Sequence, residues 1–517
     1  MTSIDAGETH ARRPDPNPAP AIPAWLRGLG LLALIGGFMA AWTTVATISD
    51  ATAALHHDTV EAYVWGQSFQ LGYFKHPPFW AWVAGLWFSV FPRANWAAYL
   101  LCVTNTTIGL AGAWRLVGCF ATGDKRVAAT VLLLATPFYT LMAMVFNANS
   151  IFYSIWPWTL FFFVRSLDRE RLSDAVMFGV LVGVAALSKY FAVVLAGGCI
   201  LSLPFHPRGW AWLRSASPWI AAVIASVLFA PHLWWLIQND FPTIAYFRAE
   251  AGRSFAFTLG NVASMPFEWL ASLAIVGLIA VFGARMTPRA LRENLRERAR
   301  EPRFRFIVAL LAFPLILTLL AGLAFQAKLA TNWTEAAFPL APLVVLEMVG
   351  GDMNRIKRLS VVAVVAITVL ALAVSPAIQL GLVSPKAPNR TDPRRELALE
   401  ATRQWRQAFG APVPIVAGTF PFDEAIAFYS ADRPSAFIDF DPQHAPWITK
   451  ARLAQNGLLV ACLSNDNDCL REAQAFSTPQ TRRSAVVLTH DRRFNPPKPM
   501  SFSLFLTPPH ITAASRT

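Results

Sequence analysis

The sequence contains few charged residues. Asp, Glu, Lys and Arg together make up 15% of its 517 residues, whereas 55% of the residues are hydrophobic. Soluble domains carry about 25% charged residues, so this composition disfavours a soluble protein and favours a membrane protein. The stretch 29–48 contains no charged residue. At about 1.5 Å per residue it is long enough to cross a hydrocarbon core about 30 Å thick.

Motifs that bind nucleotides or catalytic zinc are also missing. The sequence has no Walker loop, no dinucleotide-binding glycine fingerprint and no His-Glu-x-x-His motif. A reaction catalysed by this chain would therefore draw its energy from the substrate rather than from a nucleotide bound in the cytoplasm.

Cysteine is scarce, and one pair is spaced for a bond. Cys102, Cys119 and Cys199 lie in or beside apolar segments, where they serve packing. Cys462 and Cys469, in the sequence CLSNDNDC, follow the last apolar segment. In an oxidising compartment this pair is expected to form a disulfide, and two free thiols are the alternative. No neighbouring His or Cys completes a metal site around them.

The apolar segments predict about eleven transmembrane helices. They lie near 29–48, 96–118, 127–146, 151–167, 174–188, 191–205, 218–237, 263–284, 306–325, 334–350 and 359–381. Lysine and arginine are concentrated in alternate loops, and the run 285–305 alone contains eight arginines. By the positive-inside rule these loops are cytoplasmic. This predicts a multi-pass protein of the bacterial inner membrane with a cytoplasmic N-terminus and a periplasmic C-terminal part. The basic run then faces anionic lipid rather than nucleic acid.

Changes in composition predict the domain organisation. The expected parts are a disordered cytoplasmic tail (1–23), a transmembrane domain (24–381) with its first periplasmic loop at 50–95, a linker (382–396) and a periplasmic α/β domain (397–517). In the last part, strands are expected at 414–419, 435–440, 457–463, 484–490 and 501–506, and helices at 423–430 and 464–475. The predicted fold class is thus a polytopic all-α membrane protein with a small C-terminal α/β domain.

The first periplasmic loop contains an unusually polar and aromatic stretch, HDTVEAYVWGQSFQLGYFKHPP at 57–78. Asp58 and Glu61 are three residues apart, so on a helical turn their carboxylates share one face. Such a pair can deprotonate an acceptor or hold a divalent cation. The alternative is a purely structural role for Asp58 as a helix N-cap. The aromatic side chains could stack on sugars or form an ordinary interfacial belt, and they are Tyr63, Trp65, Tyr73, Phe74, Trp80 and Trp82.

The same stretch resembles the first periplasmic loop of bacterial glycosyltransferase family 39. This family has the GT-C fold and includes lipid A aminoarabinose transferases and protein O-mannosyltransferases. Its loop carries an acidic pair before Ala-Tyr/His-Tyr-Trp, then Gly-Tyr-Phe and a basic residue ahead of Pro-Pro. The segments EAYVW (61–65) and GYFKHPP (72–78) match that order, and Val60 stands where the family has Asp. Either Asp58 takes that role two residues earlier, or the general base lies elsewhere.

Two further motifs extend the resemblance over about residues 25–350. In FNANS (146–150), Asn149 stands where the family often has the Asp of a Thr-Pro-Asp element. Asn147 and Asn149 can hydrogen-bond sugar hydroxyls, although asparagines in a tight turn are equally expected. In ALSKY (186–190), Lys189 and Tyr190 match a Leu-Ser-Lys-Tyr element. Lys189 emerges on the outer face, where it pairs with a lipid phosphate or snorkels to the interface.

The resemblance implies an inverting transferase that uses a polyprenyl-phosphate sugar as donor and an envelope glycan or lipid, such as lipopolysaccharide or lipid A, as acceptor. Asp58, supported by Glu61, would take the acceptor proton, and Lys189, Lys75 and Lys328 would bind the donor phosphate. Lys328 and Trp333 come from KLATNW (328–333), which resembles a loop of the family beside the cavity. The residues implied in substrate binding are Tyr63, His76, Asn147, Asn149, Tyr190 and Trp333. A divalent cation near the acids is possible, and the sugar is not identified.

Two other classes of function compete with this interpretation. A transporter or flippase of lipid-linked sugars would also have many helices and a polar cavity, but transporters place ionisable residues near mid-membrane and contain repeats. A scaffold would use the C-terminal domain to recruit partners. Four acids of that domain could line an acceptor groove or serve as helix caps and solvated turns, and they are Asp423, Glu424, Asp439 and Asp441.

Overall fold

The computed structural model describes residues 24–383 and 387–509. The expected tail at 1–23, residues 384–386 of the expected linker and residues 510–517 lie outside the described residues. The α-helices of the N-terminal part are α1 (Ala24–Ser49), α2 (His57–Gly66), α3 (Phe79–Val90), α4 (Asn95–Val117), α5 (Gly123–Leu133), α6 (Phe152–Arg169), α7 (Leu172–Ala186), α8 (Ala192–Ser202), α9 (Gly209–Arg214), α10 (Ser217–Gln238), α11 (Pro242–Glu250), α12 (Phe255–Ala284), α13 (Pro288–Arg298), α14 (Pro302–Phe325), α15 (Ala341–Val349) and α16 (Met353–Leu380). Short 3-10 helices are η1 (Pro137–Tyr139), η2 (Met142–Met144), η3 (Leu203–Phe205), η4 (Thr331–Trp333) and η5 (Glu335–Ala337).

Five of the described helices are long and apolar enough to cross a membrane, namely α4, α10, α12, α14 and α16. A sixth span results if α5 and the turns that follow it, which are bent by 71°, count as one. The eleven predicted spans are therefore not confirmed. The predicted spans 174–188 and 191–205 correspond to the separate helices α7 and α8, but these have only 15 and 11 residues. The stretch 334–350 contains a 3-10 turn before the short α15.

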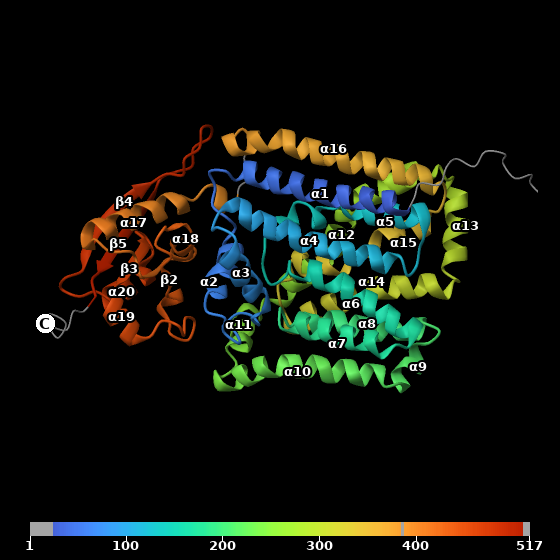
Figure 1. Ribbon diagram of the computed structural model, residues 1–517, viewed down its shortest axis with the longest axis horizontal. Helices are drawn as coiled ribbons and strands as arrows, with labels where there is room; N and C mark the ends of the chain where they lie inside the picture. The colour runs from blue at the N-terminus through green and yellow to red at the C-terminus, as the bar shows by residue number, and fades with distance from the viewer. Residues whose placement is uncertain (1–23, 384–386, 510–517) are drawn as a thin grey trace, which may run out of the picture.

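The helices form an elongated bundle with different structures at its two ends. Figure 1 shows the C-terminal sheet at one end, next to α2 and α3, and α13 at the opposite end. Helices α4 and α6 pack along each other, as do α7 and α10. The loop at 57–78, which contains Asp58 and Glu61, therefore lies at one end of the bundle, and the basic run at 285–305 lies at the other.

The first loop is itself mostly helical, because it forms α2 and α3 rather than an irregular connection. The two helices touch at Gly66 and Gly85. A Cβ atom on Gly66 would lie 2.3 Å from the carbonyl oxygen of Ala81, and one on Gly85 would lie 2.2 Å from that of Gly66. Only glycine allows backbones to approach so closely. This contact fixes the position of α2, which carries Asp58 and Glu61.

The C-terminal part contains a five-stranded sheet in the order β2-β1-β3-β5-β4. Its strands are β1 (Ile415–Gly418), β2 (Ser435–Ala436), β3 (Leu458–Leu463), β4 (Arg482–Leu488) and β5 (Met500–Thr507). Its helices are η6 (Pro388–Arg390), α17 (Arg394–Phe409), α18 (Phe422–Tyr429), η7 (Ile438–Phe440), α19 (Lys450–Asn456) and α20 (Asn467–Ala475). Strand β1 pairs in parallel with β2 and β3, whereas β5 is antiparallel to β3 and β4. All five predicted strands are present.

The second strand is much shorter than predicted. It stops at Ala436 because Asp439 and Phe440 have φ of 53° and 56°, which an extended strand does not tolerate. Helix α17 was not expected, and it begins inside the predicted linker. Its Arg-rich sequence has the composition of a linker, and only the spacing of Leu397, Ala401 and Trp405 places a buried face on it.

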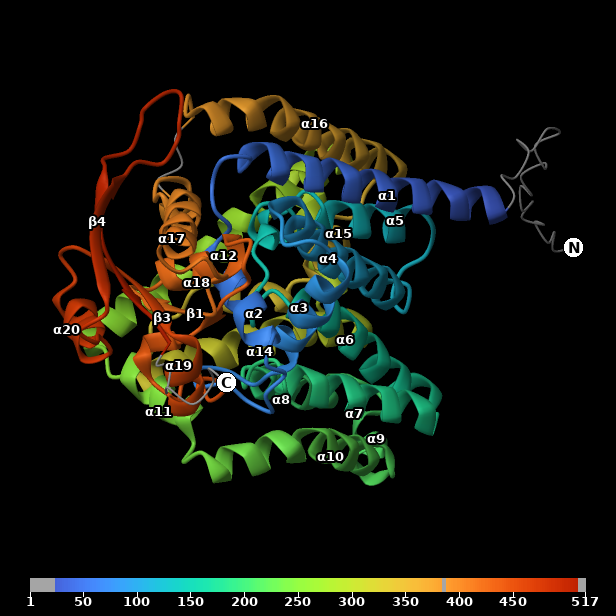
Figure 2. The ribbon, with the colours of Figure 1, turned by 60° about the vertical axis from the view of Figure 1, so that its left-hand side comes forward.

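Hydrogen bonds attach the C-terminal part to the helices beside the first loop. The Tyr429 hydroxyl donates to Asn95 Oδ1 at 2.8 Å and accepts from the backbone N–H of Leu55 at 2.7 Å. Arg93 Nη1 donates to the carbonyl oxygens of Phe428 and Ser430, each at 2.9 Å. Helix α18 is thereby held against α2, as Figure 2 shows.

Cys462 and Cys469 form a disulfide, with their Cα atoms 5.7 Å apart. The bond joins β3 to α20, whose N-terminus is capped by Asp466. The closed loop is short, so the chain-entropy model gives a contribution of about 2–3 kcal/mol. We expect Cys462→Ser/Cys469→Ser to lower the melting temperature of the C-terminal part by several degrees, measured as temperature-dependent protease cleavage of that part in the full-length protein. A reductant should have no further effect on the variant, and equal melting with and without the bond would contradict the expectation.

Candidate functional site

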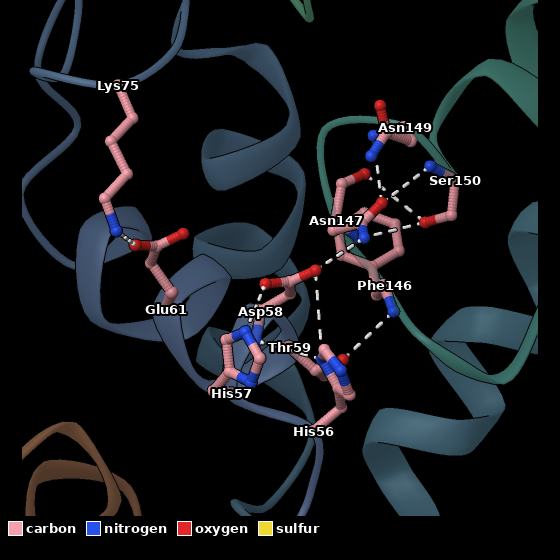
Figure 3. A network of polar contacts seen from close by, with 10 residues as sticks. All are labelled: His56, His57, Asp58, Thr59, Glu61, Lys75, Phe146, Asn147, Asn149 and Ser150. Carbon is pink, nitrogen blue, oxygen red and sulfur yellow. Dashed lines mark hydrogen bonds and ion pairs between the residues drawn. The ribbon is translucent and has the colours of Figure 1, made fainter. Parts of the chain in front are cut away.

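Asp58 lies in the first turn of α2 and is bound by side chains from two segments of the chain. Asn147 Nδ2 donates a hydrogen bond to Asp58 Oδ2 at 2.8 Å, and His57 Nε2 lies 3.1 Å from Oδ1. Figure 3 shows the carboxylate pointing toward the loop at 146–150. Asp58 is not the N-cap considered from the sequence, because that position is His56, whose ring accepts the Asp58 backbone N–H. The carboxylate is therefore free of a capping task.

The surroundings of Asp58 keep it ionised. Burial by itself would raise its pKa, but the hydrogen bond with His57 and the charges of His56 and His57 outweigh burial. Together with the hydrogen bond from Asn147, they hold the pKa of Asp58 well below its usual range. The carboxylate has Asn147 on one oxygen and His57 on the other, so its orientation is fixed. Because it is ionised, it can accept a proton.

The loop at 146–150 is built around Asn147 (Figure 3). Asn147 Oδ1 accepts hydrogen bonds from the backbone N–H groups of Asn149 and Ser150 at 2.9 and 2.8 Å. The Phe146 backbone N–H donates to Thr59 Oγ1 at 3.0 Å, which attaches the loop to α2. Asn147 therefore stabilises the tight turn through its amide oxygen and holds Asp58 through its amide nitrogen.

Lys189 lies in the break between α7 and α8 and points to the same loop. Its Nζ donates to Asn149 Oδ1 at 2.6 Å and lies 4.3 Å from the ring centroid of Trp333. No carboxylate pairs with it within the described residues. Burial lowers the pKa of Lys189 to about 7, against the opposing charge of Asp58. A half-buried ammonium held by an amide and an aromatic ring is suited to an anionic ligand.

His76 completes this group as a neutral imidazole. Burial, followed by the charges of Lys189 and Lys75, lowers the pKa of His76 to about 3. The His76 ring itself packs against Trp80 and Tyr246, with centroids 6.1 and 6.3 Å apart. A neutral ring can donate one hydrogen bond and accept another without adding charge.

Glu61 and Lys75 form a separate ion pair beside this group. Lys75 Nζ lies 2.6 Å from Glu61 Oε1, and the two side chains point toward each other in Figure 3. Burial would lower the pKa of Lys75, but the charges of Glu61 and Glu424 raise it above its ordinary value. Lys75, predicted as a phosphate ligand, is therefore already occupied by carboxylates.

Two acids of α18 face this ion pair. Asp423 and Glu424 are 2% and 1% exposed, and among the described residues neither carboxylate oxygen of Glu424 has a hydrogen-bond partner. They are not the caps or solvated turns considered from the sequence. Burial raises the pKa of both, and the charges of Glu61 and Asp423 add to the effect on Glu424. The sequence showed the acids but not the packing of α18 on α2, which buries them.

These raised pKa values predict that the attachment of α18 weakens as pH rises. A carboxyl whose folded pKa lies above its unfolded pKa contributes stability at low pH, and this contribution is lost as pH rises through the folded pKa. We expect the melting temperature of the full-length protein to fall by several degrees between about pH 5 and about pH 8. Asp423→Asn/Glu424→Gln should remove most of this slope, whereas Asp468→Asn, at an exposed acid of α20, should retain it. A slope unchanged in the double variant would contradict the assignment.

The remaining predicted residues lie further from Asp58 or are covered. Tyr63 is 4% exposed and packs edge-on against Phe88 and Phe428, so it joins α2 to α18 rather than offering a free face. The Tyr190 hydroxyl bonds His232 and Thr243 at 2.8 and 2.9 Å. Lys328 is exposed. Five of the six aromatic residues in and beside the loop are buried core residues, not an interfacial belt, and they are Tyr63, Trp65, Tyr73, Phe74 and Trp80.

The sequence reasoning missed the two histidines before Asp58. His56 and His57 stack on each other with ring centroids 4.2 Å apart. With Asp58 they form a group whose ligand atoms all lie within 4.8 Å of one another, close enough for one metal ion to contact all three. The adjacent letters HHD at 56–58 could have been noticed, because two imidazoles and a carboxylate are ordinary ligands of divalent transition metals.

The comparisons with known proteins agree on one family. Residues 75–235 match the family model described as dolichyl-phosphate-mannose-protein mannosyltransferase. The chain is 27% identical over 317 residues to the lipid A galacturonosyltransferase RgtD of Rhizobium johnstonii, and 26% identical over 343 residues to the lipopolysaccharide core galacturonosyltransferase RgtB of the same organism. All of these matches fit glycosyltransferase family 39. The resemblance seen in the sequence is confirmed at this level.

The extent of each match differs. The two sequence matches cover 60% and 62% of this chain and 63% and 66% of the relatives, so the chain spans just under two thirds of their length. The crystal structure of ArnT from Cupriavidus metallidurans bound to undecaprenyl phosphate has a TM-score of 0.59 and 13% identity, over 92% of this chain and 98% of that chain. This neighbour establishes the GT-C fold. The family model includes Lys189 and the loop at 146–150 but begins after Asp58.

Proposed function

We propose that this protein is an integral-membrane glycosyltransferase that moves a sugar from a polyprenyl phosphate to an envelope acceptor on the periplasmic face. The observation that carries the proposal is that one loop, 146–150, binds both an ionised carboxylate, Asp58, and the ammonium of Lys189, which has no carboxylate partner among the described residues. A transferase of this kind needs a base for the acceptor and a cation for the leaving phosphate. The structure of ArnT with undecaprenyl phosphate supports a lipid phosphate as the donor carrier.

The transfer is a single displacement. The acceptor hydroxyl oxygen attacks the anomeric carbon, the bond from that carbon to the phosphate oxygen breaks, and the configuration inverts. The acceptor proton passes to Asp58, and the electron pair leaves with the polyprenyl phosphate. Asp58 is a weak base. It accepts the proton only as the new bond forms, because formation of that bond makes the hydroxyl proton acidic. Asn147 and His57 keep the carboxylate in position for this step.

The leaving phosphate is stabilised on the other side of the site. Lys189 holds the negative charge, and Asn149 and Trp333 orient the ammonium. Neutral His76 donates a hydrogen bond to a phosphate or sugar oxygen. Lys75 and Glu61 act as a positioning pair that fixes α2. The apolar surfaces of neighbouring helices accommodate the polyprenyl chain.

A divalent cation would fit the nitrogen and oxygen atoms of His56, His57 and Asp58. When bound, it would polarise an oxygen ligand and compensate negative charge at the acceptor side. The residues that would hold it do not include Lys189, whose ammonium contacts Asn149 and Trp333 instead.

The relatives suggest which sugar to test first. RgtD and RgtB are named as galacturonosyltransferases acting on lipid A and on the lipopolysaccharide core. We propose a uronic acid as the transferred sugar, with lipid A or core oligosaccharide as the acceptor.

The test uses membranes containing the full-length protein or an empty vector. They receive polyprenyl-phosphate-linked galacturonic acid, a neutral hexose or an amino sugar, each with lipid A or core acceptors, and products are identified by mass spectrometry. Protein-dependent transfer supports the proposal, and the preferred donor decides the sugar. Movement of the lipid-linked sugar across the bilayer without transfer would instead establish a flippase. Absence of both would overturn the proposal.

A further inference from the structure

A second polar site lies at the end of the helical bundle opposite the C-terminal sheet. A cavity of about 410 Å³ opens between the end of α4, the start of α5 and the end of α6. Figure 1 shows these helix ends on the side of α13, far from α2. The cavity is lined by Arg115, Gly118, Cys119, Arg126, Phe161, Arg165, Asp168 and Arg169. Four arginines thus converge from three helices.

Arg126 forms a fixed wall of this cavity. Its guanidinium lies 3.9 Å from the ring centroid of Trp114, and its Nε donates to the Trp114 carbonyl oxygen at 3.1 Å. A Cβ atom on Gly118 would lie 2.6 Å from Arg126 Cζ, so the absent side chain leaves room for the guanidinium. The remaining N–H groups keep their donor capacity, because a guanidinium carries five of them.

Arg165 contributes a donor that is not satisfied within the described residues. Its Nη2 pairs with Asp174 Oδ1 at 3.0 Å, but its Nε is buried and has no hydrogen-bond partner. An unsatisfied buried donor costs about 1–3 kcal/mol. Arg165 itself lines the cavity. Phe161, 5.2 Å from the Arg165 guanidinium, adds an apolar side to the cavity.

The charges around the cavity do not balance. Asp174 compensates Arg165, and Asp168 lies 3.2 Å from His206 Nε2, so one carboxylate of the lining faces the three further guanidiniums of Arg115, Arg126 and Arg169. Arg115 and Arg169 are exposed and form no ion pair within the described part of the chain. Guanidiniums gathered beside a low-dielectric bundle repel one another unless an anion lies between them. Planar forked donors match the geometry of phosphate oxygens.

We propose that this cavity binds the phosphate of an anionic membrane lipid. Several of the helices next to it are apolar enough to cross a membrane, so their ends lie at the depth of lipid head groups. The guanidiniums would hold the phosphate oxygens, and Phe161 would contact the start of an acyl chain. The cavity does not include Asp58, and lipid binding there does not depend on the transfer reaction.

The test compares two double variants that remove the same charge from the same end of the molecule. Arg115→Gln/Arg169→Gln changes exposed arginines of the cavity, whereas Arg292→Gln/Arg296→Gln changes exposed arginines of α13. Binding of phosphatidylglycerol and phosphatidylcholine with identical chains is measured on full-length protein by native mass spectrometry. A basic residue contributes about 1 kcal/mol to anionic lipid binding, so the cavity variant should bind phosphatidylglycerol about 10- to 30-fold more weakly. The α13 variant should lose less affinity than the cavity variant, because its exposed arginines face the lipid surface without converging on one phosphate.

Other outcomes overturn the proposal. If both variants lose the same affinity for phosphatidylglycerol, the effect is one of general surface charge. If the wild type binds the two lipids equally, the cavity does not require an anionic lipid. Inorganic phosphate is the third probe. If it protects the wild type from thermal unfolding while phosphatidylglycerol does not, the cavity is a site for a free anion and not for a lipid. Unchanged melting temperatures of the ligand-free variants show that both fold.

Discussion

Asp58→Asn should abolish sugar transfer while leaving expression and melting temperature close to those of the wild type. Asparagine keeps the shape of the side chain, but it cannot accept a proton from the acceptor. Loss of a general base costs about 10²- to 10⁴-fold in rate. The measurement is the initial rate of transfer in membranes with matched protein levels, followed by mass spectrometry. Asp468→Asn, which changes an exposed acid on α20, should keep the full rate.

Glu61→Gln separates the two acids of the loop. Glu61 binds Lys75 at 2.6 Å, whereas Asn147 and His57 bind Asp58. Its substitution should weaken the position of α2 and lower the rate less than Asp58→Asn does. A fully active Asp58→Asn protein combined with an inactive Glu61→Gln protein would move the base to Glu61 and contradict the assignment made from the hydrogen bonds.

The C-terminal part belongs to the site through its packing. Helix α18 places buried Asp423 and Glu424 against the Glu61–Lys75 pair, and Phe420 contacts both the ring of His57 and Lys75 Nζ. His444 stacks on Phe74 with centroids 3.8 Å apart. A domain that only recruited partners would not need to bury acids beside the loop. The contacts instead couple the stability of the C-terminal part to the position of α2.

Local patterns predicted the parts of this fold that depend on short segments. The five strands were visible because alternating or continuous apolar runs are short and bounded by turns. The candidate base was visible because its neighbours EAYVW and GYFKHPP are contiguous. Distant contacts were not predictable: Asn147 reaches Asp58 across 89 positions, and no pattern in one sequence specifies that pair. The predicted number of spans was not confirmed, because apolar composition does not reveal where tertiary packing shortens or bends a helix.

The site also shows why charge alone is a poor guide to a residue's task. Lys75, Lys189 and Lys328 are indistinguishable as outward lysines in the sequence, yet their surroundings differ. Lys75 is neutralised by Glu61, Lys328 is exposed, and Lys189 is half-buried beside Asn149 and Trp333 without a carboxylate partner. Only the last arrangement leaves a positive charge available to a ligand inside the site. Donor binding should therefore depend far more on Lys189 than on Lys75 or Lys328.

Lys189→Gln should lower kcat/KM for the lipid-linked donor by about 100-fold, which is typical for removal of one preorganised electrostatic partner of a developing charge. The wild-type profile should also depend on pH. Because burial lowers the pKa of Lys189 to about 7, its ammonium loses a proton as pH rises through neutrality, and kcat/KM for the donor should fall between about pH 7 and about pH 9. The donor phosphodiester does not titrate in this range, so the decrease reports the enzyme.

Lys189→Arg distinguishes charge from a structural role. A guanidinium remains protonated throughout this range, so the variant should show a flat pH profile even if its different shape lowers the maximal rate. Lys328→Gln, at an exposed lysine, is the control that should keep the wild-type profile. An Arg variant with the same decrease as the wild type would show that another group titrates, and Lys189 would then be a support for Asn149 rather than the ligand of the leaving phosphate.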